Sequence, residues 1–360
     1  MERCAKCILP KTFPGIKFNN QGICNYCQNH KRFTVKGEKE LEKILSQYRG
    51  KGKKADCLVT TGGGRDSLFV LYRIVKDFKM KTVSATYDWG LMTPEARRNW
   101  ERASKILDVE HFVIPSNTDK IKKHIRKNVK TWLKKPNLGM VPIFTQADKT
   151  AEYHINKLTK KLKVPLIIGG TTPFETTIFK AGFLGVFEAA VFSNLSTKNR
   201  LKLLIRYLMQ FLKNPGYINE SLIESMKGYI VQYITKFSSK IKWLDFFDYI
   251  MWEENEVVST IRKELNWESP KDTILTWRTD DWTAPFYNYL HYTMKGFTEN
   301  DTLRSNQIKE GVLSRKEALK IVEKENQPRI KAMNDYFNLI GLDMNKEKLD
   351  KILKSYQLYT

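Results

Sequence analysis

The sequence predicts an α/β fold built on a doubly wound parallel sheet, with a cysteine-bearing segment before the sheet and a mostly helical region after it. Two observations support this prediction. Two CxxC pairs open the chain, and short apolar runs then alternate with amphipathic stretches of helical period as far as about residue 190. Beyond that point successive helices are expected. The predicted divisions are an N-terminal segment 1–50, an α/β domain 51–190, and a helical C-terminal region 191–360 that contributes substrate or partner contacts.

The composition describes an ordinary globular protein with an unusual charge. Of 360 residues, 41% are apolar, and no window approaches 18 uncharged apolar residues, so no membrane span is expected. The N-terminus lacks the apolar core of a secretory signal, which favours a cytoplasmic protein. The formal net charge is +23. This excess favours phosphate-rich partners such as nucleotides, sugar nucleotides, RNA or anionic lipid, although a generally lysine-rich protein would show it too.

Four of the five cysteines are spaced as a metal site. Cys4 and Cys7 form one CxxC pair, and Cys24 and Cys27 form the other. Two such pairs suit tetrahedral thiolate coordination of structural Zn²⁺, whereas two disulfides are disfavoured in a reducing cytosol. Four thiolates would close the coordination shell and leave no position for catalysis. Cys57 lies in an apolar run and is expected to be a buried side chain rather than a nucleophile.

The stretch that bears most directly on chemistry is 57-CLVTTGGGRDSLFVLY-72. The run from Asp56 to Thr61 predicts a buried strand, and the apolar period from Ser67 onward predicts a helix with one buried face. A strand, a glycine loop and a helix together point backbone N–H groups at an anion. A tight turn without a ligand is the alternative. The candidate anion-binding residues are Thr61, Gly62, Gly63, Gly64, Arg65, Asp66 and Ser67.

The following segments predict further strands of the same sheet, at 81–87, 110–115 and 164–168, separated by helices. Ligands of such sheets bind at the carboxyl ends of the strands, so the expected pocket loops are 61–67, 87–95, 115–118, 144–149 and 169–176. Polar residues and glycines in or near these loops are candidates for the nucleotide or substrate, although surface or capping roles are open for each of them. They are Asp88, Asn99, Asp148, Gly169, Gly170 and Glu175.

Three features stand out in the C-terminal half. Basic and apolar residues alternate at helical spacing over 198–213, as in a helix that lies on a membrane or, the interpretation we favour, one whose apolar face is core. The segment 276–297 is rich in aromatic and acidic residues, which suits a substrate wall or a subunit interface. Ser314 and Glu317 are spaced as a capping box that opens a helix.

The glycine loop resembles the PP-loop, SGGxDS, of the ATP pyrophosphatase superfamily, which releases AMP and pyrophosphate. Gly63, Gly64, Asp66 and Ser67 match the motif, and Gly62 stands where its first serine belongs. The neighbouring Thr60 or Thr61 would supply the missing hydroxyl if the loop is shifted by one residue. The resemblance implies ATP and Mg²⁺ as cofactors, with Asp66 organising the magnesium, Arg65 and Ser67 contacting phosphate, and Asp88 near the nucleotide.

Over most of its length the chain also resembles the N-acetyl sugar amidotransferases of bacterial surface-polysaccharide (O-antigen-like, lipopolysaccharide) biosynthesis. The resemblance lies in the N-terminal cysteine segment, the glycine loop about thirty residues after it, and the closing 307-QIKEGVLSRKEALKIV-322. The segment 169-GGTTPFETTIF-179 departs from the family pattern. The implied reaction is adenylation of the N-acetyl carbonyl of a nucleotide-linked sugar, followed by attack of ammonia to give an acetamidino sugar. The implied partners are an external glutaminase and a barrel-shaped, cyclase-like channel subunit, and nucleic acid is not expected.

The leading alternative is a PP-loop tRNA-modifying enzyme that transfers sulfur. Such enzymes are basic and place a zinc-binding segment before the loop. They typically need further cysteines for sulfur relay or an iron–sulfur cluster, and only Cys57 remains here. A non-catalytic zinc module that binds nucleic acid by charge is a third reading. It leaves the glycine loop unexplained.

Overall fold

In the computed structural model, five parallel strands form one sheet in the order β3-β2-β1-β4-β5. The structure describes residues 2–175, 177, 179–187, 196–238 and 241–357. The predicted fold class is confirmed: a doubly wound parallel α/β sheet, preceded by a cysteine-bearing segment and followed by a mostly helical region. The strands are β1 (Cys57–Thr60), β2 (Thr82–Asp88), β3 (His111–Pro115), β4 (Leu166–Gly169) and β5 (Lys242–Asp245).

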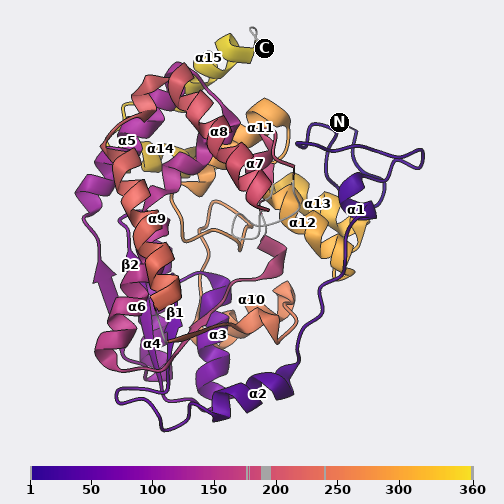
Figure 1. Cartoon of the computed structure of the whole chain (residues 1–360). Helices are drawn as coiled ribbons and strands as arrows, with labels where there is room; N and C mark the ends of the chain where they lie inside the picture. Colours follow the sequence, from indigo (N-terminus) through magenta and orange to yellow (C-terminus); the bar gives the residue numbers. More distant parts are fainter. Residues whose placement is uncertain (1, 176, 178, 188–195, 239–240, 358–360) are drawn as a thin grey trace.

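Helices cover both faces of the sheet (Figure 1). One face packs against α2 (Glu38–Ser46), α3 (Arg65–Lys76), α4 (Pro94–Leu107) and α10 (Glu254–Leu265) in a core that includes Leu41, Leu71, Leu107 and Ile261. The other face packs against α6 (Ala151–Leu162), where Leu58, Val83 and Ile167 meet Ile155. Burial on both faces explains why the central strands are nearly continuous apolar runs.

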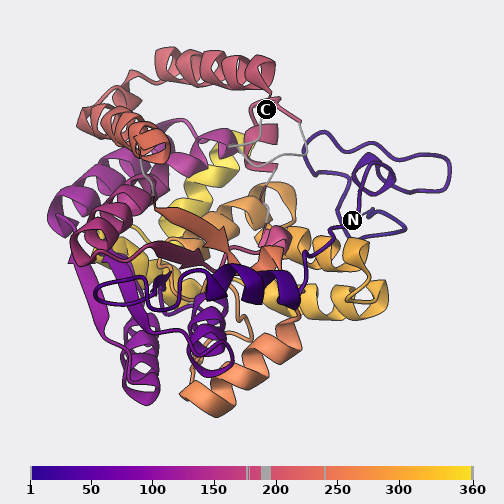
Figure 2. The ribbon, with the colours of Figure 1, turned by 60° about the horizontal axis from the view of Figure 1, so that its bottom comes forward.

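A second core lies beside the sheet and is built almost entirely from helices. It joins α5 (Thr118–Lys134) and the 3-10 segment η1 (Leu138–Thr150) to α11 (Ala284–Lys295), α14 (Ile330–Leu339) and α15 (Lys346–Gln357). The N-terminal segment, with α1 (Asn25–Gln28), lies on α12 (Glu299–Glu310) and α13 (Arg315–Glu325), away from the sheet (Figures 1 and 2). The remaining helices are α7 (Phe179–Gly182), α8 (Thr197–Lys213) and α9 (Glu220–Ser238).

Several predicted elements are confirmed, and some differ. The four predicted strands form, and the capping box of Ser314 and Glu317 opens α13. The apolar run 141–144 belongs to the 3-10 segment η1. β5 was not predicted and comes from beyond residue 190, although the division at that residue stays a prediction. The preferred interpretation of 198–213, that its apolar face is core, is wrong for most of that face, because Leu204, Leu208 and Leu212 are more than half exposed.

Among the described residues, no helix combines the length and the apolar character needed to cross a membrane.

Candidate active site

The glycine loop joins the end of β1 to the start of α3, in the middle of the sheet. β2 and β3 lie on one side of β1, and β4 and β5 on the other, so the loop stands at the point where the strand order reverses. In open parallel sheets this switch point is where ligands bind. The loop after β4 lies against it, since a Cβ on Gly170 would lie 3.2 Å from the Cα of Ser67.

Gly63, the middle glycine of the loop, cannot carry a side chain, because of its backbone conformation and because of its close contact with α4. Gly63 has φ +80°, and a Cβ there would lie 2.0 Å from the carbonyl oxygen of Ala96 on α4. A side chain is therefore excluded by close helix packing as well as by conformation. The Gly63 N–H donates to Thr61 Oγ1 at 3.2 Å, and the Thr61 and Ser67 hydroxyls are 3.1 Å apart. Thr61 thus supplies a hydroxyl inside the loop, although Gly62 replaces the motif's serine.

The outer two glycines face an aspartate that comes from far along the chain. A Cβ on either Gly62 or Gly64 would lie 3.1 Å from Oδ2 of Asp280. Burial, together with the charge of Asp281, raises the pKa of Asp280 to about 6. The glycines therefore leave a bare backbone surface, and a carboxylate lies directly over it.

This surface is part of an open cavity of about 450 Å³. That volume is in the range of small-molecule sites. Its apolar lining includes Trp89, Met92, Ile155 and Trp243. Its charged lining residues are mostly acidic. They are Arg65, Asp66, Glu152, Glu175, Arg278, Asp280 and Asp281.

Asp66 and Glu175 form a carboxylate pair in the cavity lining. Asp66 accepts a hydrogen bond from Trp252 Nε1 at 2.6 Å, and Arg65 Nε donates to its other oxygen at 3.3 Å. Burial, followed by the charge of Asp66, raises the pKa of Glu175 well above its ordinary value, despite the opposing charge of Arg65. Carboxylates crowded in this way gain stability when a cation joins them.

The donor set fits a hard divalent ion. Carboxylate oxygens are the side-chain ligands that Mg²⁺ prefers, and a magnesium ion usually completes its shell with water and phosphate oxygens. Asp66, Glu175 and Asp280 face the cavity next to the bare glycine backbone. They are the residues that would hold Mg²⁺ if a nucleotide phosphate lay on the loop.

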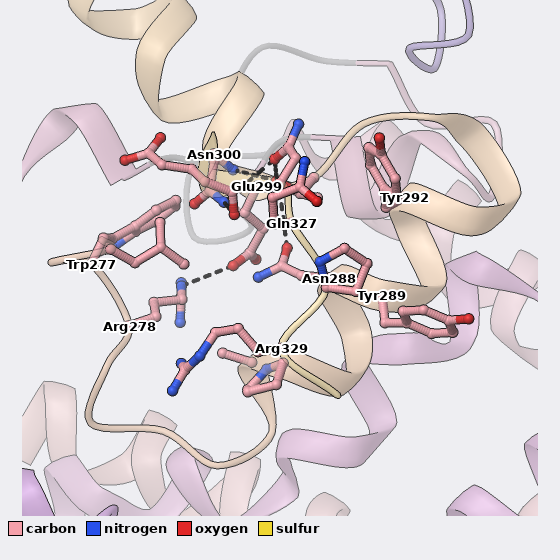
Figure 3. A pocket seen from close by; sticks show the side chains of 16 residues that line it. Trp277, Arg278, Asn288, Tyr289, Tyr292, Glu299, Asn300, Gln327 and Arg329 are labelled. Carbon is pink, nitrogen blue, oxygen red and sulfur yellow. Dashed lines mark hydrogen bonds and ion pairs between the residues drawn. The ribbon is translucent and has the colours of Figure 1, made fainter. Parts of the chain in front are cut away.

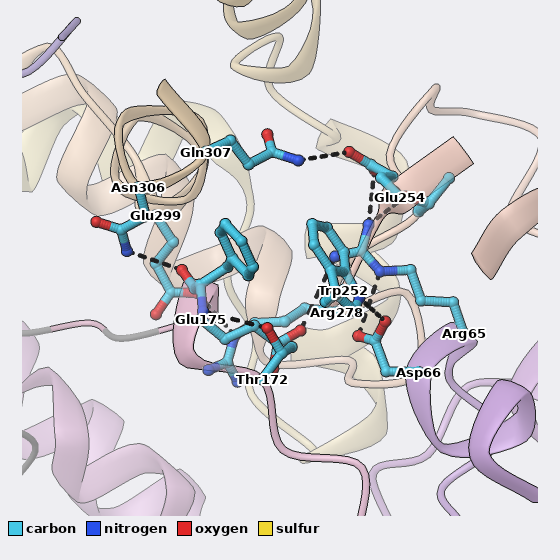
Figure 4. Close-up of polar contacts among 12 residues, drawn as sticks. Arg65, Asp66, Thr172, Glu175, Trp252, Glu254, Arg278, Glu299, Asn306 and Gln307 are labelled. Carbon is cyan, nitrogen blue, oxygen red and sulfur yellow. Dashed lines mark hydrogen bonds and ion pairs between the residues drawn. The ribbon is translucent and has the colours of Figure 1, made fainter. Parts of the chain in front are cut away.

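Arg65 is placed differently from the phosphate contact that we predicted. It is only 2% exposed, and its Nη1 donates to Glu254 Oε1 at 2.7 Å and to Thr276 Oγ1 at 2.5 Å. Its guanidinium lies 4.8 Å from the Trp252 ring, and its Nη2 is 3.9 Å from Glu175 (Figure 4). Arg65 therefore fixes the loop to the C-terminal region, and phosphate binding by it stays a prediction.

Glu254 connects Arg65 to a second buried arginine. Arg304 on α12 contacts Glu254 and Glu325, and its Nη1 donates to Gln307 at 2.8 Å. Burial alone would raise the pKa of Glu254, but Arg65 and Arg304 outweigh it and hold this pKa at about 2. The first turn of α3 is thus connected by buried charges to the helices that carry the closing sequence pattern.

The other predicted site residues divide into two groups. Ser67 and Gly170 line the cavity, as do Thr61 and Glu175. Asp88 instead pairs with Arg97 at 2.9 Å. Asn99 supports the loop from behind, donating to the carbonyls of Gly63 and Glu268. Gly169 lies in β4 against Asp245. Asp148 lies outside the residues whose side chains the structure describes.

Sequence reasoning missed most of the C-terminal contribution to the site. Thr276, Trp277, Arg278, Asp280 and Asp281 all line the cavity. The available signal was the density of aromatic and acidic residues over 276–297, which suggested a substrate wall without identifying its members. Trp252 and Glu254 gave no local signal, because their partners lie almost 190 residues earlier in the chain.

Behind this wall is a second, much smaller pocket (Figure 3). Its volume of about 30 Å³ leaves room for roughly two waters and no substrate. Glu299 lies in it, 3.0 Å from Arg278 and 2.5 Å from Lys180. Burial opposes ionisation of this carboxyl, but Arg278 and Lys180 lower the pKa of Glu299 to about 2. This ion cluster fixes Arg278 in the cavity wall.

The four predicted metal ligands do come together. Their Sγ atoms all lie within 4.8 Å of one another, and two of the separations are 3.8 Å (Cys7–Cys24) and 4.0 Å (Cys4–Cys27). Zn–S bonds of about 2.3 Å place tetrahedral sulfurs about 3.8 Å apart, so the spacing suits a single ion. A [4Fe–4S] cluster, with its irons at separate corners, holds its cysteines farther apart.

The surroundings of these sulfurs are those of a structural centre. The backbone N–H of Cys24 donates to Cys4 Sγ at 3.2 Å, and Arg315 Nε donates to the carbonyls of Cys4 and Cys7 at 3.1 and 2.9 Å. All four cysteines are buried. The cluster fastens the N-terminal segment to α13 and lies away from the sheet (Figure 1). Metal binding at these residues is thus supported, and zinc as the metal stays a proposal.

No family model matches the chain. It is 27% identical over 116 residues to an uncharacterized protein of Methanocaldococcus jannaschii; the match covers 31% of this chain and spans 42% of the length of that relative. Among solved structures, it is similar to a U34-tRNA thiolase from Methanococcus maripaludis with its [4Fe–4S] cluster. The TM-score is 0.34 at 13% identity, over 96% of this chain and 99% of that one. We transfer no residue role or ligand from this likeness.

These findings correct the predicted reaction. They give no support to an amidotransferase acting on a nucleotide-linked N-acetyl sugar, and the solved structure named above is a tRNA thiolase. Of the two enzyme classes considered from the sequence, the sugar amidotransferase is therefore contradicted. The associated terms, sugar nucleotide and O-antigen or lipopolysaccharide biosynthesis, are withdrawn with it.

Proposed function

We propose that the chain is an ATP-using enzyme of PP-loop type, which cleaves ATP between its α and β phosphates and transfers AMP to a carbonyl oxygen of its substrate. The observation that carries the proposal is the bare glycine loop at the switch point of the sheet, open to a cavity whose lining includes several acidic residues. Backbone N–H groups and the start of α3 suit the departing pyrophosphate. The apolar and aromatic residues in the cavity lining suit the adenine ring.

An amide-like carbonyl is a poor electrophile, so its oxygen must be converted into a good leaving group before a nucleophile can replace it. The carbonyl oxygen of an amide-like substrate attacks the α phosphorus. The bond between that phosphorus and the oxygen that bridges the α and β phosphates breaks, and pyrophosphate leaves. A nucleophile then adds to the activated carbon, and AMP departs with the original oxygen. Mg²⁺, held by Asp66, Glu175 and Asp280, would neutralise charge on the phosphates and separate them from the carboxylate of Asp280.

We propose a carbonyl of a tRNA nucleobase as the acceptor, in place of the sugar. The net charge of +23 supports this choice, because counterion release from a phosphate backbone favours strongly basic proteins. The sulfur or other nucleophile must come from outside the chain. Four cysteines are grouped as candidate metal ligands, and burial raises the pKa of Cys57, a core residue, to about 12.

The test is release of AMP and pyrophosphate by the purified chain with ATP and Mg²⁺, with and without a pool of unmodified tRNA. We expect tRNA to stimulate release, and the stimulation to weaken steeply with salt. Asp66→Asn should abolish release, whereas Asp88→Asn, a matched change of a carboxylate that turns to Arg97, should retain it. If the two variants are equally impaired, the assignment of Asp66 to the site is wrong.

A further inference from the structure

The outer faces of α8 and α9 expose many large apolar side chains. On α8 the six exposed ones lie between 40% and 69% accessible, and they are Leu201, Leu204, Ile205, Leu208, Met209 and Leu212. Soluble monomers rarely expose contiguous apolar patches of this kind without a use for them. We refer to the exposed faces of these two helices as the α8–α9 surface.

The pattern on α8 gives the helix two separate apolar faces. Leu203, Tyr207 and Phe211 are spaced by four residues and pack inward, against Leu184, Val186 and the helical core. Leu201, Ile205, Leu208 and Leu212 recur at i, i+4, i+7 and i+11, which places them together on a different, exposed face. The inner face already attaches the helix to the protein, so the outer face is not needed for folding.

The same arrangement continues onto α9. Its inner side contacts η1, α5 and α6. On its outer side Ile223, Met226, Ile230 and Ile234 are 56–58% exposed. Both helices lie at the front of the molecule in Figure 1 and at its upper edge in Figure 2, with α8 outermost. Each of the two helices of the α8–α9 surface therefore exposes an apolar face.

Its charges are basic. α8 carries five basic residues and no acidic one: Lys198, Arg200, Lys202, Arg206 and Lys213. At 100° per residue, Lys202, Arg206 and Lys213 fall along one border of the exposed apolar face. The acidic residues at the start of α9 are engaged by α5, since Glu224 pairs with Lys120 at 3.2 Å and Glu220 lies 3.8 Å from Lys123.

We propose that the α8–α9 surface binds the face of a membrane rich in anionic lipid, with the helices lying in the interface. An apolar face bordered by lysine and arginine is the pattern of interfacial helices, in which apolar burial and attraction to acidic headgroups act together. A second copy of the chain fits less well, because α8 against α8 would bring five positive charges against five. RNA would satisfy the basic border but would leave the apolar side chains in water.

The experiment is flotation of the full-length chain with vesicles of phosphatidylcholine alone or with one quarter phosphatidylglycerol. We expect flotation with the anionic vesicles, much weaker flotation with the neutral ones, and weakening as salt rises from about 0.1 M to about 1 M. Changing Lys202, Arg206 and Lys213 to serine should weaken binding to the anionic vesicles by about 100-fold. Equal binding to both vesicle types would overturn the proposal.

A matched pair of triple variants tests the apolar part. Leu204→Asp, Leu208→Asp and Leu212→Asp together should weaken binding at least about 100-fold. Ile106→Asp, Val113→Asp and Ile274→Asp change the net charge equally at exposed apolar positions outside the surface, and should leave binding within about threefold. If both triples act alike, or if light scattering shows a dimer that the leucine triple dissociates, lipid is not the occupant.

Discussion

The buried carboxylate of Glu254 offers a quantitative test of how the loop is attached to the C-terminal helices. Replacing it by glutamine removes the negative charge between Arg65 and Arg304 while keeping the shape of the side chain. The pKa of Glu254 is held at about 2, against an ordinary value of 4.5. A difference of about 2.5 units corresponds to about 3 kcal/mol of the free energy of unfolding at neutral pH.

That value agrees with the usual cost of removing one partner from a buried ion pair, about 3–5 kcal/mol. For 360 residues, an unfolding entropy of about 2.1 cal/mol/K per residue converts 3 kcal/mol into a fall in Tm of about 4 °C. Calorimetry and urea unfolding at pH 7 measure the two quantities. The pKa of Glu254 is depressed in the folded state, so its contribution is present above pH 4.5 and declines as the pH falls toward 2.

Glu256→Gln is the matched control, because it lies on the same helix with a side chain 50% exposed and only a 3.5 Å contact to Arg73. Its expected cost is below about 0.5 kcal/mol. If Glu254→Gln destabilises the protein no more than this control, the buried network does not hold the loop in the way described.

Three further predictions concern the loop, the cavity and the metal. Gly63→Ala should lower the free energy of unfolding far more than Gly50→Ala. Both glycines have positive φ, which costs a side chain about 1–2 kcal/mol, but only a Cβ at Gly63 would clash with the Ala96 backbone. Equal losses in urea unfolding would contradict the packing argument. The pKa of Asp280 is raised to about 6 from 3.8, so ionisation of this carboxyl destabilises the folded protein as the pH rises from about 4 to about 6. Asp280→Asn should therefore be about 3 kcal/mol more stable than the wild type at pH 8 and lose this advantage near pH 4, which melting curves across pH measure. The same variant should bind Mg·ATP more weakly. Elemental analysis should find about one zinc per chain and no visible absorbance of an iron–sulfur cluster, with the metal lost in Cys24→Ser and retained in Cys57→Ser; an iron–sulfur spectrum would refute the single-ion geometry.

The parts of the site that the sequence revealed are local. The glycine loop, the two CxxC pairs and the capping box of α13 each consist of a few neighbouring residues whose types dictate their geometry. The parts that it concealed depend on distant partners. The role of Arg65 is decided by Glu254 and Thr276, which reach it only after the chain has passed through most of the fold.

Two other misses have simple physical causes. β5 has only four residues, and Leu244 is the one buried among them. The sequence therefore has no apolar run there that would predict an edge strand. For α8, apolar periodicity correctly predicted a helix with an apolar face, but periodicity does not tell whether that face meets protein or solvent. In the structure one apolar face of α8 packs inward and another is exposed.

Cleavage of ATP at the α–β position is the chemistry on which the proposed function depends, and the identity of the phosphorus products tests it directly. Phosphorus NMR of the full-length chain with Mg·ATP and unmodified tRNA should show AMP and pyrophosphate in equal amounts, and neither from Asp66→Asn. ADP and orthophosphate, or unchanged ATP with every acceptor supplied, would contradict the account.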